Sequence, residues 1–161
     1  MVDRGFDPNS IKKTIHVDAE PRIAWRVFTE KMGTWWPLAY YKIGNAKAVD
    51  AVIEPYVGGR WFERGEDAST CQWGSVLVWE PPSHLVLTWD VDAGWKYDSN
   101  LRTEIEVRFI SEGPKRTRVE FEHRRLDRYG AQREEMRRIY DTEGDWGKLL
   151  EAFANLAAKE N

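Results

Sequence analysis

The sequence predicts an α+β domain in which a curved antiparallel sheet of about seven strands wraps around a long C-terminal helix. Three observations predict it. The middle of the chain is strand and turn throughout, two short helical segments follow the first strand, and an apolar stripe at helical spacing closes the chain. A sheet and a helix with one apolar face each bury these faces against one another. We expect one domain over residues 11–161, after a loose lead-in at residues 1–10.

The chain opens with a predicted strand and two short helices. Residues 11–17 alternate between apolar and polar positions, as a strand with one covered face does. Pro21 suits the first turn of a helix, and apolar residues then recur at helical spacing. A second short helix is expected around Trp36, where Pro37 ends it.

Six further strands are expected in the middle of the chain, separated by glycine, proline and polar turn residues. They are residues 49–54, 60–64, 71–80, 85–91, 101–110 and 117–124. The last two strands alternate most regularly, with charged residues on one face and apolar residues on the other. One face of the sheet is therefore expected to lie in water and the other to be covered.

The C-terminal part is predicted to be helical. Residues 131–140 form a charge-rich helix, and Gly144 interrupts it before a second helix begins. The apolar stripe of that last helix consists of Trp146, Leu149, Leu150, Phe153 and Ala157. The only large apolar surface that can cover this stripe is the concave face of the sheet. A cavity remains wherever the sheet curls more than the helix can fill, and this cavity is the predicted binding site.

Tryptophan is the most informative residue type, with nine copies in 161 residues. Trp61, Trp73, Trp79 and Trp89 lie on three neighbouring strands. Each indole has about 150–250 Å² of surface to cover, so together they predict one wall of an aromatic interior. The alternative is that they only fill the core. The residues expected to line the cavity are Trp36, Trp61, Glu63, Trp73, Trp89, Phe121, His123, Trp146, Leu150 and Phe153.

Two polar residues are candidates for chemistry. Glu63 shares a strand face with Trp61, so it can accept a hydrogen bond from a ligand or act as a base; alternatively it pairs with an arginine. His123 lies on the inner face of its strand, where it can move a proton, or serve as a core histidine bonded to a backbone carbonyl. Cys71 has no neighbouring base in the sequence and is expected to be a partly buried thiol.

Composition excludes several classes. The net charge is −3 with acids and bases interspersed, which argues against nucleic acid as a partner. The apolar runs are too short for a membrane span, and no hydrophobic signal core is present. Three scattered histidines provide no metal-ligand spacing, and no cofactor motif is found, so neither metal nor cofactor is expected. Together with the absence of a membrane span and a signal core, the single cysteine indicates a cytoplasmic protein. We expect a monomer or a homodimer, since an exposed edge strand can pair two copies.

Several segments also match a known family in order and spacing. They are HVDAEPRIAWRVFTEKMGTWW, VIEPYVGGRWFERGED, WGSVLVWEPPSHLVLTW, TEIEVRF, TRVEFEH and GDWGKLLEAFANLA, and the resemblance that they carry covers residues 11–158. In these segments the chain resembles the START-like (SRPBCC) superfamily. Within it, the chain is similar to the bacterial branch named after the C-terminal domain of the activator of the heat-shock chaperone ATPase. The resemblance implies the helix-grip fold, which hosts carriers, receptors, cyclases and chaperone activators.

Three hypotheses for the function follow. The first is binding of a small hydrophobic molecule in the cavity between the curved sheet and the C-terminal helix. The second is an enzyme of the polyketide cyclase, aromatase or dehydratase kind, in which Glu63 or His123 moves a proton. The third is regulation of a chaperone ATPase. The pairing of Glu63 and His123 discriminates the first two, because unpaired groups in an open cavity favour catalysis and tied groups favour binding.

Overall fold

The computed structural model describes residues 7–141 and 145–160. Over these residues it contains one seven-stranded antiparallel sheet with the strand order β1-β7-β6-β5-β4-β3-β2. The strands are β1 (Ile11–Val17), β2 (Ala48–Ile53), β3 (Arg60–Gly65), β4 (Thr70–Glu80), β5 (His84–Trp89), β6 (Thr103–Gly113) and β7 (Arg116–Arg124). The helices are α1 (Pro21–Glu30), α2 (Met32–Trp35), the 3₁₀ helix η1 (Leu126–Gln132), α3 (Arg133–Asp141) and α4 (Asp145–Lys159).

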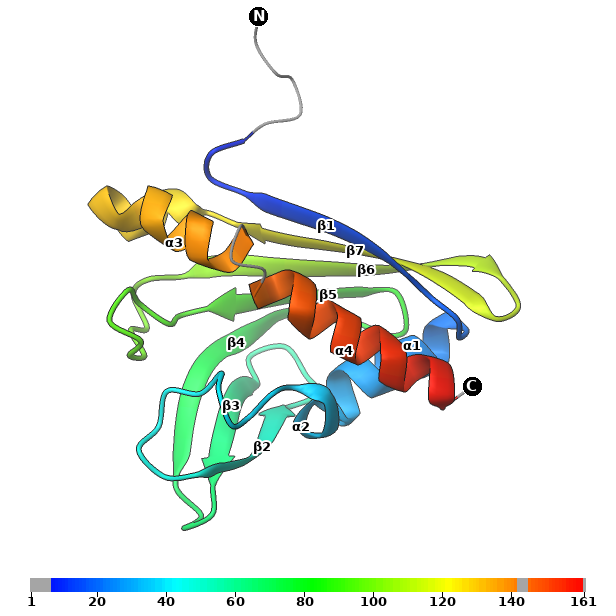
Figure 1. Cartoon of the computed structure of the whole chain (residues 1–161), viewed down its shortest axis with the longest axis horizontal. Coiled ribbons are helices and arrows are strands. Elements are labelled where there is room, and N and C mark those ends of the chain that lie inside the picture. Colours follow the sequence, from blue (N-terminus) through cyan, green and yellow to red (C-terminus); the bar gives the residue numbers. More distant parts are fainter. Residues whose placement is uncertain (1–6, 142–144, 161) are drawn as a thin grey trace, which may run out of the picture.

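The sheet bends so that β4, β3 and β2 curl toward α4, which crosses the concave side (Figure 1). Residues of α4 such as Leu150 and Phe153 are buried against the inner face of the sheet and against α1. The predicted fold class is therefore confirmed. No helix among the described residues is long and apolar enough to cross a membrane.

Most element boundaries agree with the sequence prediction within two residues. The strand expected to begin at Leu101 begins at Thr103 instead, because Arg102 has a φ of +53° and leaves the extended region. Of the predicted lead-in, residues 1–6 lie outside the described part, as does Gly144 at the predicted break before α4. Ser10 is buried and donates a hydrogen bond to Glu122 at 2.6 Å.

Of the three register shifts in the half of the sheet that curls, two involve the pairing of β4 with its neighbours. One lies between Trp61 and Phe62 of β3, and the other between Val76 and Val78 of β4. A bulge adds a residue to one strand, which kinks that strand and increases the local twist. Close to these bulges, Gly74 lets β4 approach β5 directly, since a Cβ built on Gly74 would lie 1.8 Å from the Thr88 carbonyl oxygen.

Substitution of Gly74 by alanine is therefore expected to destabilise the protein by about 3 kcal/mol, because the strands β4 and β5 must separate. The matched control is Gly147→Ala in α4, where a Cβ would meet nothing within 4 Å. That change should stabilise the helix by about 0.5–1 kcal/mol. Urea denaturation of both variants measures the difference, and equal stability of the two would contradict the close approach at Gly74.

The outer face of the sheet is charged. The Arg124 guanidinium lies 2.9 Å from Glu104, 3.3 Å from Glu106 and 3.7 Å from Glu122, so cross-strand ion pairs link β6 and β7 on this side. The apolar residues of the same strands, such as Ile105 and Phe121, are buried on the inner side. As the alternation predicts, the interior of the curved sheet is where a ligand site can form.

Candidate functional site

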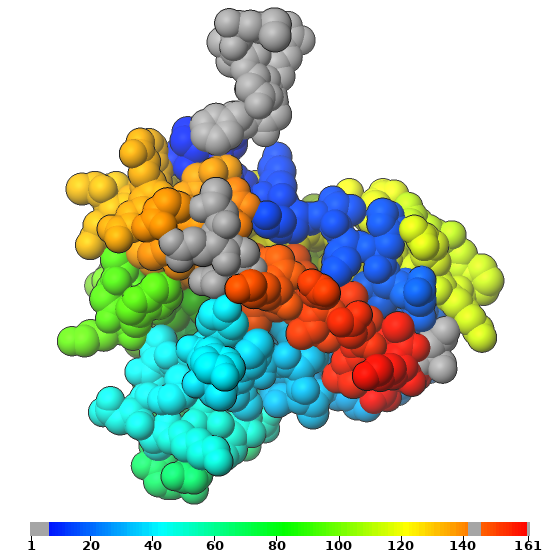
Figure 2. Space-filling model, in the orientation of Figure 1, coloured from blue at the N-terminus to red at the C-terminus, as the bar shows by residue number. Residues whose placement is uncertain are grey.

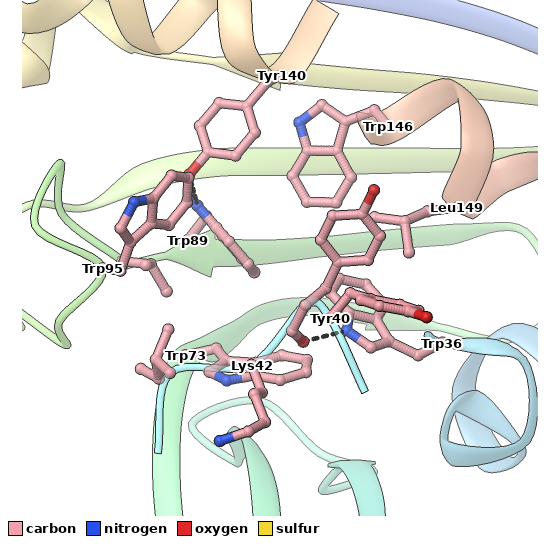
Figure 3. A pocket seen from close by; sticks show the side chains of 12 residues that line it. Trp36, Tyr40, Lys42, Trp73, Trp89, Trp95, Tyr140, Trp146 and Leu149 are labelled. Atoms are coloured by element: carbon pink, nitrogen blue, oxygen red, sulfur yellow. Dashed lines mark hydrogen bonds between the residues drawn. The ribbon is translucent and has the colours of Figure 1, made fainter. Parts of the chain in front are cut away.

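A pocket of about 400 Å³ lies between α4 and the sheet. The neighbouring strands β4 and β5 contribute Trp73 and Trp89 to it. Two irregular segments complete its walls: residues 36–43, which follow α2, and the loop 90–98, which follows β5. Figure 2 shows α4 and the segment after α2 on the same face of the molecule. The lining residues are Trp36, Tyr40, Tyr41, Lys42, Ile43, Trp73, Trp89, Val91, Trp95, Tyr140, Trp146 and Leu149 (Figure 3).

The walls of the pocket are indoles that pack against one another. The ring centroids of Trp36 and Trp73 are 4.8 Å apart, and those of Trp89 and Trp146 are 5.3 Å apart in an edge-to-face arrangement. Trp61 lies behind them, with its ring centroid 5.2 Å from that of Trp89. Such aromatic pairs contribute about 0.5–1.5 kcal/mol beyond the area that they bury, which makes the walls rigid.

Trp79 does not join this cluster, and the prediction of one aromatic wall that includes it is wrong. Its ring centroid lies 5.1 Å from that of Trp25 on α1. Trp79 lies six positions after Trp73 in β4, which at about 3.3 Å per residue is about 20 Å along the strand. The sequence shows which strand carries an indole, but not that α1 covers this end of the sheet.

Glu63 faces inward beside Trp61, with 2% of its surface exposed. Three N–H groups donate to its carboxylate: the backbone amides of Ile43 at 2.6 Å and Gly44 at 3.2 Å, and the indole of Trp73 at 2.9 Å. The prediction of an arginine partner is wrong. The carboxylate instead joins the segment after α2 to a wall of the pocket.

The segment after α2 has further internal ties. The Lys42 ammonium donates to the carbonyl oxygens of Gly44 and Ala46, the latter at 3.1 Å. The Trp36 indole donates to the Tyr41 carbonyl oxygen at 2.8 Å. Gly44 also packs tightly, since a Cβ there would lie 3.1 Å from Glu63 Oε2. The segment is thus a fixed wall, although it contains no strand or long helix.

His123 is fully buried and lies one layer behind the pocket. Its Nδ1 accepts a hydrogen bond from the Trp146 indole at 3.1 Å, so the proton of the neutral ring is on Nε2. Nε2 lies 2.9 Å from Thr103 Oγ1, whose own hydrogen is donated to the Trp89 carbonyl at 2.6 Å. Burial lowers the pKa of His123 from 6.5 to about 3. The ring is therefore neutral and fully hydrogen-bonded.

The residues that the sequence predicts as a lining occupy three places. Trp36, Trp73, Trp89 and Trp146 line the pocket itself. Trp61, Phe121 and Leu150 lie deeper, around a small void of about 10 Å³. Glu63, His123 and Phe153 line neither space. Phe153 packs under α1, with its ring centroid 5.2 Å from that of Phe28.

Apart from Trp36, sequence reasoning missed the lining residues of the two irregular segments, and also Tyr140 and Leu149. Tyr40, Tyr41, Lys42 and Ile43 follow no periodic pattern, so their only signal is a pair of tyrosines after a proline. Leu149 was assigned to the apolar stripe of the last helix but not to the cavity. Its place depends on how α4 is rotated over the sheet, which the stripe alone does not define.

Trp95 belongs to a tight turn at the rim of the pocket. The Asp92 carboxylate accepts hydrogen bonds from the amides of Gly94 at 2.9 Å and Lys96 at 3.0 Å. Trp95 has a φ of +61°, a left-handed conformation that a bulky side chain rarely adopts. Its ring packs edge-to-face against Tyr140 at 6.2 Å between centroids. Backbone strain of this kind is often found at functional positions.

The pocket therefore offers aromatic surface and few groups for acid–base chemistry. Neither Glu63 nor His123 projects into it, and both are hydrogen-bonded to other residues. Among the described residues no group of three or more His, Cys, Asp or Glu side chains is placed to hold a metal ion. Burial, followed by the charge of Glu63, raises the pKa of the Cys71 thiol, which disfavours the thiolate.

A curved antiparallel sheet closed by a long helix over an aromatic pocket defines a helix-grip protein. The chain belongs to the family described as Activator of Hsp90 ATPase homolog 1-like protein, whose model matches residues 18–158. This confirms the resemblance seen in the sequence. A search of curated proteins found no significant match.

Two solved structures are similar to this chain over nearly its whole length. An anthrahydroquino-γ-pyrone synthase, Txn09, complexed with SUM, is 32% identical with a TM-score of 0.65, over 93% of this chain and 99% of that one. CalC from Micromonospora echinospora, described as a self-sacrificing resistance protein, is 26% identical with a TM-score of 0.72, over 96% of this chain and 97% of that one. The first of these structures is thus described as a synthase and the second as a resistance protein.

Proposed function

We propose that the protein binds a flat, largely apolar aromatic molecule in the pocket between the sheet and α4. The observation that carries the proposal is an aromatic-lined pocket of about 400 Å³, a volume within the range of about 300–1,000 Å³ that small-molecule sites occupy. At roughly 25 cal/mol per Å², a ligand that buries about 300 Å² of apolar surface gains on the order of 7 kcal/mol before entropic costs.

The pairing of the polar groups favours binding over proton transfer. A general base must reach the proton that it abstracts. Glu63 uses its carboxylate oxygens to accept three N–H groups, and His123 uses both ring nitrogens in the core. Neither group is available at the pocket surface. Because hydrogen-bonded groups outside the cavity favour binding over catalysis, this pairing supports the binding hypothesis.

An enzyme that folds or cyclises a bound chain is the second candidate. The observation in its favour is the 32% identity to Txn09, a synthase whose name denotes a fused aromatic product. A rigid pocket can accelerate such a reaction by holding reacting atoms close together, without a dedicated base. Regulation of a chaperone ATPase stays a prediction, because it depends on an outer surface and not on this pocket.

Blocking the pocket tests the proposed function. Leu149→Trp places an indole inside the pocket, and Lys148→Trp places the same indole on the exposed side of α4. We expect the protein and the Lys148→Trp variant to bind 1,2-dihydroxyanthraquinone in a calorimetric titration, and the Leu149→Trp variant to bind it at least tenfold more weakly. Equal binding by both variants would place the ligand elsewhere and contradict the proposal.

A further inference from the structure

The four indoles that form the inner walls of the pocket all donate their N–H groups inside the protein. Two acceptors, Glu63 and His123, lie behind the pocket wall, and the other two belong to the lining residues Tyr41 and Tyr140. None of the four N–H groups is therefore free to meet a ligand, and the indoles offer it mainly carbon surface. The pairs are Trp36 to the Tyr41 carbonyl oxygen at 2.8 Å, Trp73 to Glu63 Oε1 at 2.9 Å, Trp89 to the Tyr140 hydroxyl at 2.9 Å, and Trp146 to His123 Nδ1 at 3.1 Å.

The other interior donors are also used. The Lys42 ammonium donates to two backbone carbonyls, and in Figure 3 its side chain extends away from Trp89 and Trp146. The Tyr140 hydroxyl lies 3.4 Å from that of Tyr129, which itself donates to the Val91 carbonyl at 2.8 Å. The Tyr129 hydrogen is thus used on Val91, and the Tyr140 hydroxyl already has partners within the protein.

Two lining residues near the mouth of the pocket have polar donors that are not used within the described part of the protein. Tyr40 has 83% of its surface exposed and Trp95 has 43%, so both reach solvent. Within residues 7–141 and 145–160, no acceptor is found for the Tyr40 hydroxyl or for the Trp95 indole N–H. At this side of the pocket the polar atoms of a bound molecule can meet free side-chain donors and water.

From this distribution of donors we infer that the pocket selects flat aromatic molecules whose oxygen atoms lie together on one edge, with that edge at the mouth between Tyr40 and Trp95. The inference rests on the proposed function and adds the orientation and chemical class of the ligand. An oxygen forced into the inner part of the pocket loses its hydrogen bonds to water without replacement. Burial of such an unpaired group costs about 1–3 kcal/mol, or about 5–150-fold in affinity.

Two isomers test this selectivity with equal size and composition. In 2,3-dihydroxynaphthalene both hydroxyls lie on one edge, whereas in 2,6-dihydroxynaphthalene they lie at opposite ends. We expect the 2,3 isomer to bind at least tenfold more tightly in a calorimetric titration. Equal affinities, or a preference for the 2,6 isomer, would overturn the inferred selectivity and leave the proposed function standing. Binding of neither isomer would overturn both.

A variant that frees one interior donor tests the cause. Tyr140→Phe removes the acceptor of the Trp89 N–H, which then becomes available to an oxygen deep in the pocket. We expect the affinity ratio of the isomers to fall by at least threefold, mainly through tighter binding of the 2,6 isomer. Tyr56→Phe, the same substitution outside the pocket, should leave the ratio unchanged. An unchanged ratio in folded Tyr140→Phe protein would overturn the donor argument.

Discussion

Lowering the pH from 6.5 to 4.5 is expected to reduce the free energy of unfolding by about 2–3 kcal/mol through His123 alone. Burial lowers the pKa of His123 to about 3, whereas an unfolded chain has the ordinary value of 6.5. Below pH 6.5 the His123 side chain is therefore protonated in the unfolded state but stays neutral in the native state. The stability that the neutral ring provides is complete above pH 6.5 and is lost progressively toward pH 3.

Urea denaturation at several pH values measures this effect. In the variant His123→Gln the side chain keeps an amide donor and a carbonyl acceptor but does not titrate, so the dependence on pH should be flatter between pH 6.5 and 4.5. His16→Gln, at an exposed position on β1, should keep the slope of the unchanged protein. Burial acts to raise the pKa of Glu106, but its hydrogen bond with His84 and the charges of Arg108 and Arg124 lower it overall, so the stability from this carboxylate is lost only below about pH 4.5, and equally in all three proteins. Identical slopes for all three would contradict the role of His123.

Replacement of Glu63 by alanine is expected to cost about 3–5 kcal/mol of stability. The change leaves the amides of Ile43 and Gly44 and the indole N–H of Trp73 without their acceptor, and each unsatisfied buried donor costs about 1–3 kcal/mol. Glu66→Ala, three residues along the chain and exposed, should change stability by less than about 0.5 kcal/mol.

Hydrogen exchange separates the role of Glu63 as an anchor from a general loss of stability. In Glu63→Ala, the amides of Ile43 and Gly44 should exchange faster by a larger factor than amides of β6, because the wall segment is released first. Loss of protection by one common factor throughout the protein would mean that Glu63 contributes only global stability.

The regular parts of the fold could be predicted from the sequence because each carries its own period. Alternation along β7 shows that Val119, Phe121 and His123 face inward, and all three are buried. The stripe on α4 predicts which side of that helix meets the sheet, as the burial of Leu150 and Phe153 confirms. A period of two or 3.6 residues reports directly which side of an element is covered.

The candidate site could be predicted only where it belongs to these regular elements. Trp73 and Trp89 lie on strands and Trp146 on a helix, so their inward direction follows from the pattern. Tyr40 and Trp95 lie in segments whose place depends on tertiary contacts, such as the bond from Ile43 to Glu63 and the ring contact of Trp95 with Tyr140. No local pattern predicts contacts between residues 20 positions apart in the sequence.

The indole cluster has an optical consequence. Trp36, Trp61, Trp73, Trp89 and Trp146 hold their rings in fixed mutual orientations, with contacting pairs 4.8–6.4 Å apart between centroids. At such separations the transition dipoles of neighbouring rings couple, so absorbed light is shared within the cluster instead of staying on one chromophore. If the proposed ligand quenches any one of these rings, the emission of the whole cluster should fall, so tryptophan fluorescence would report its binding.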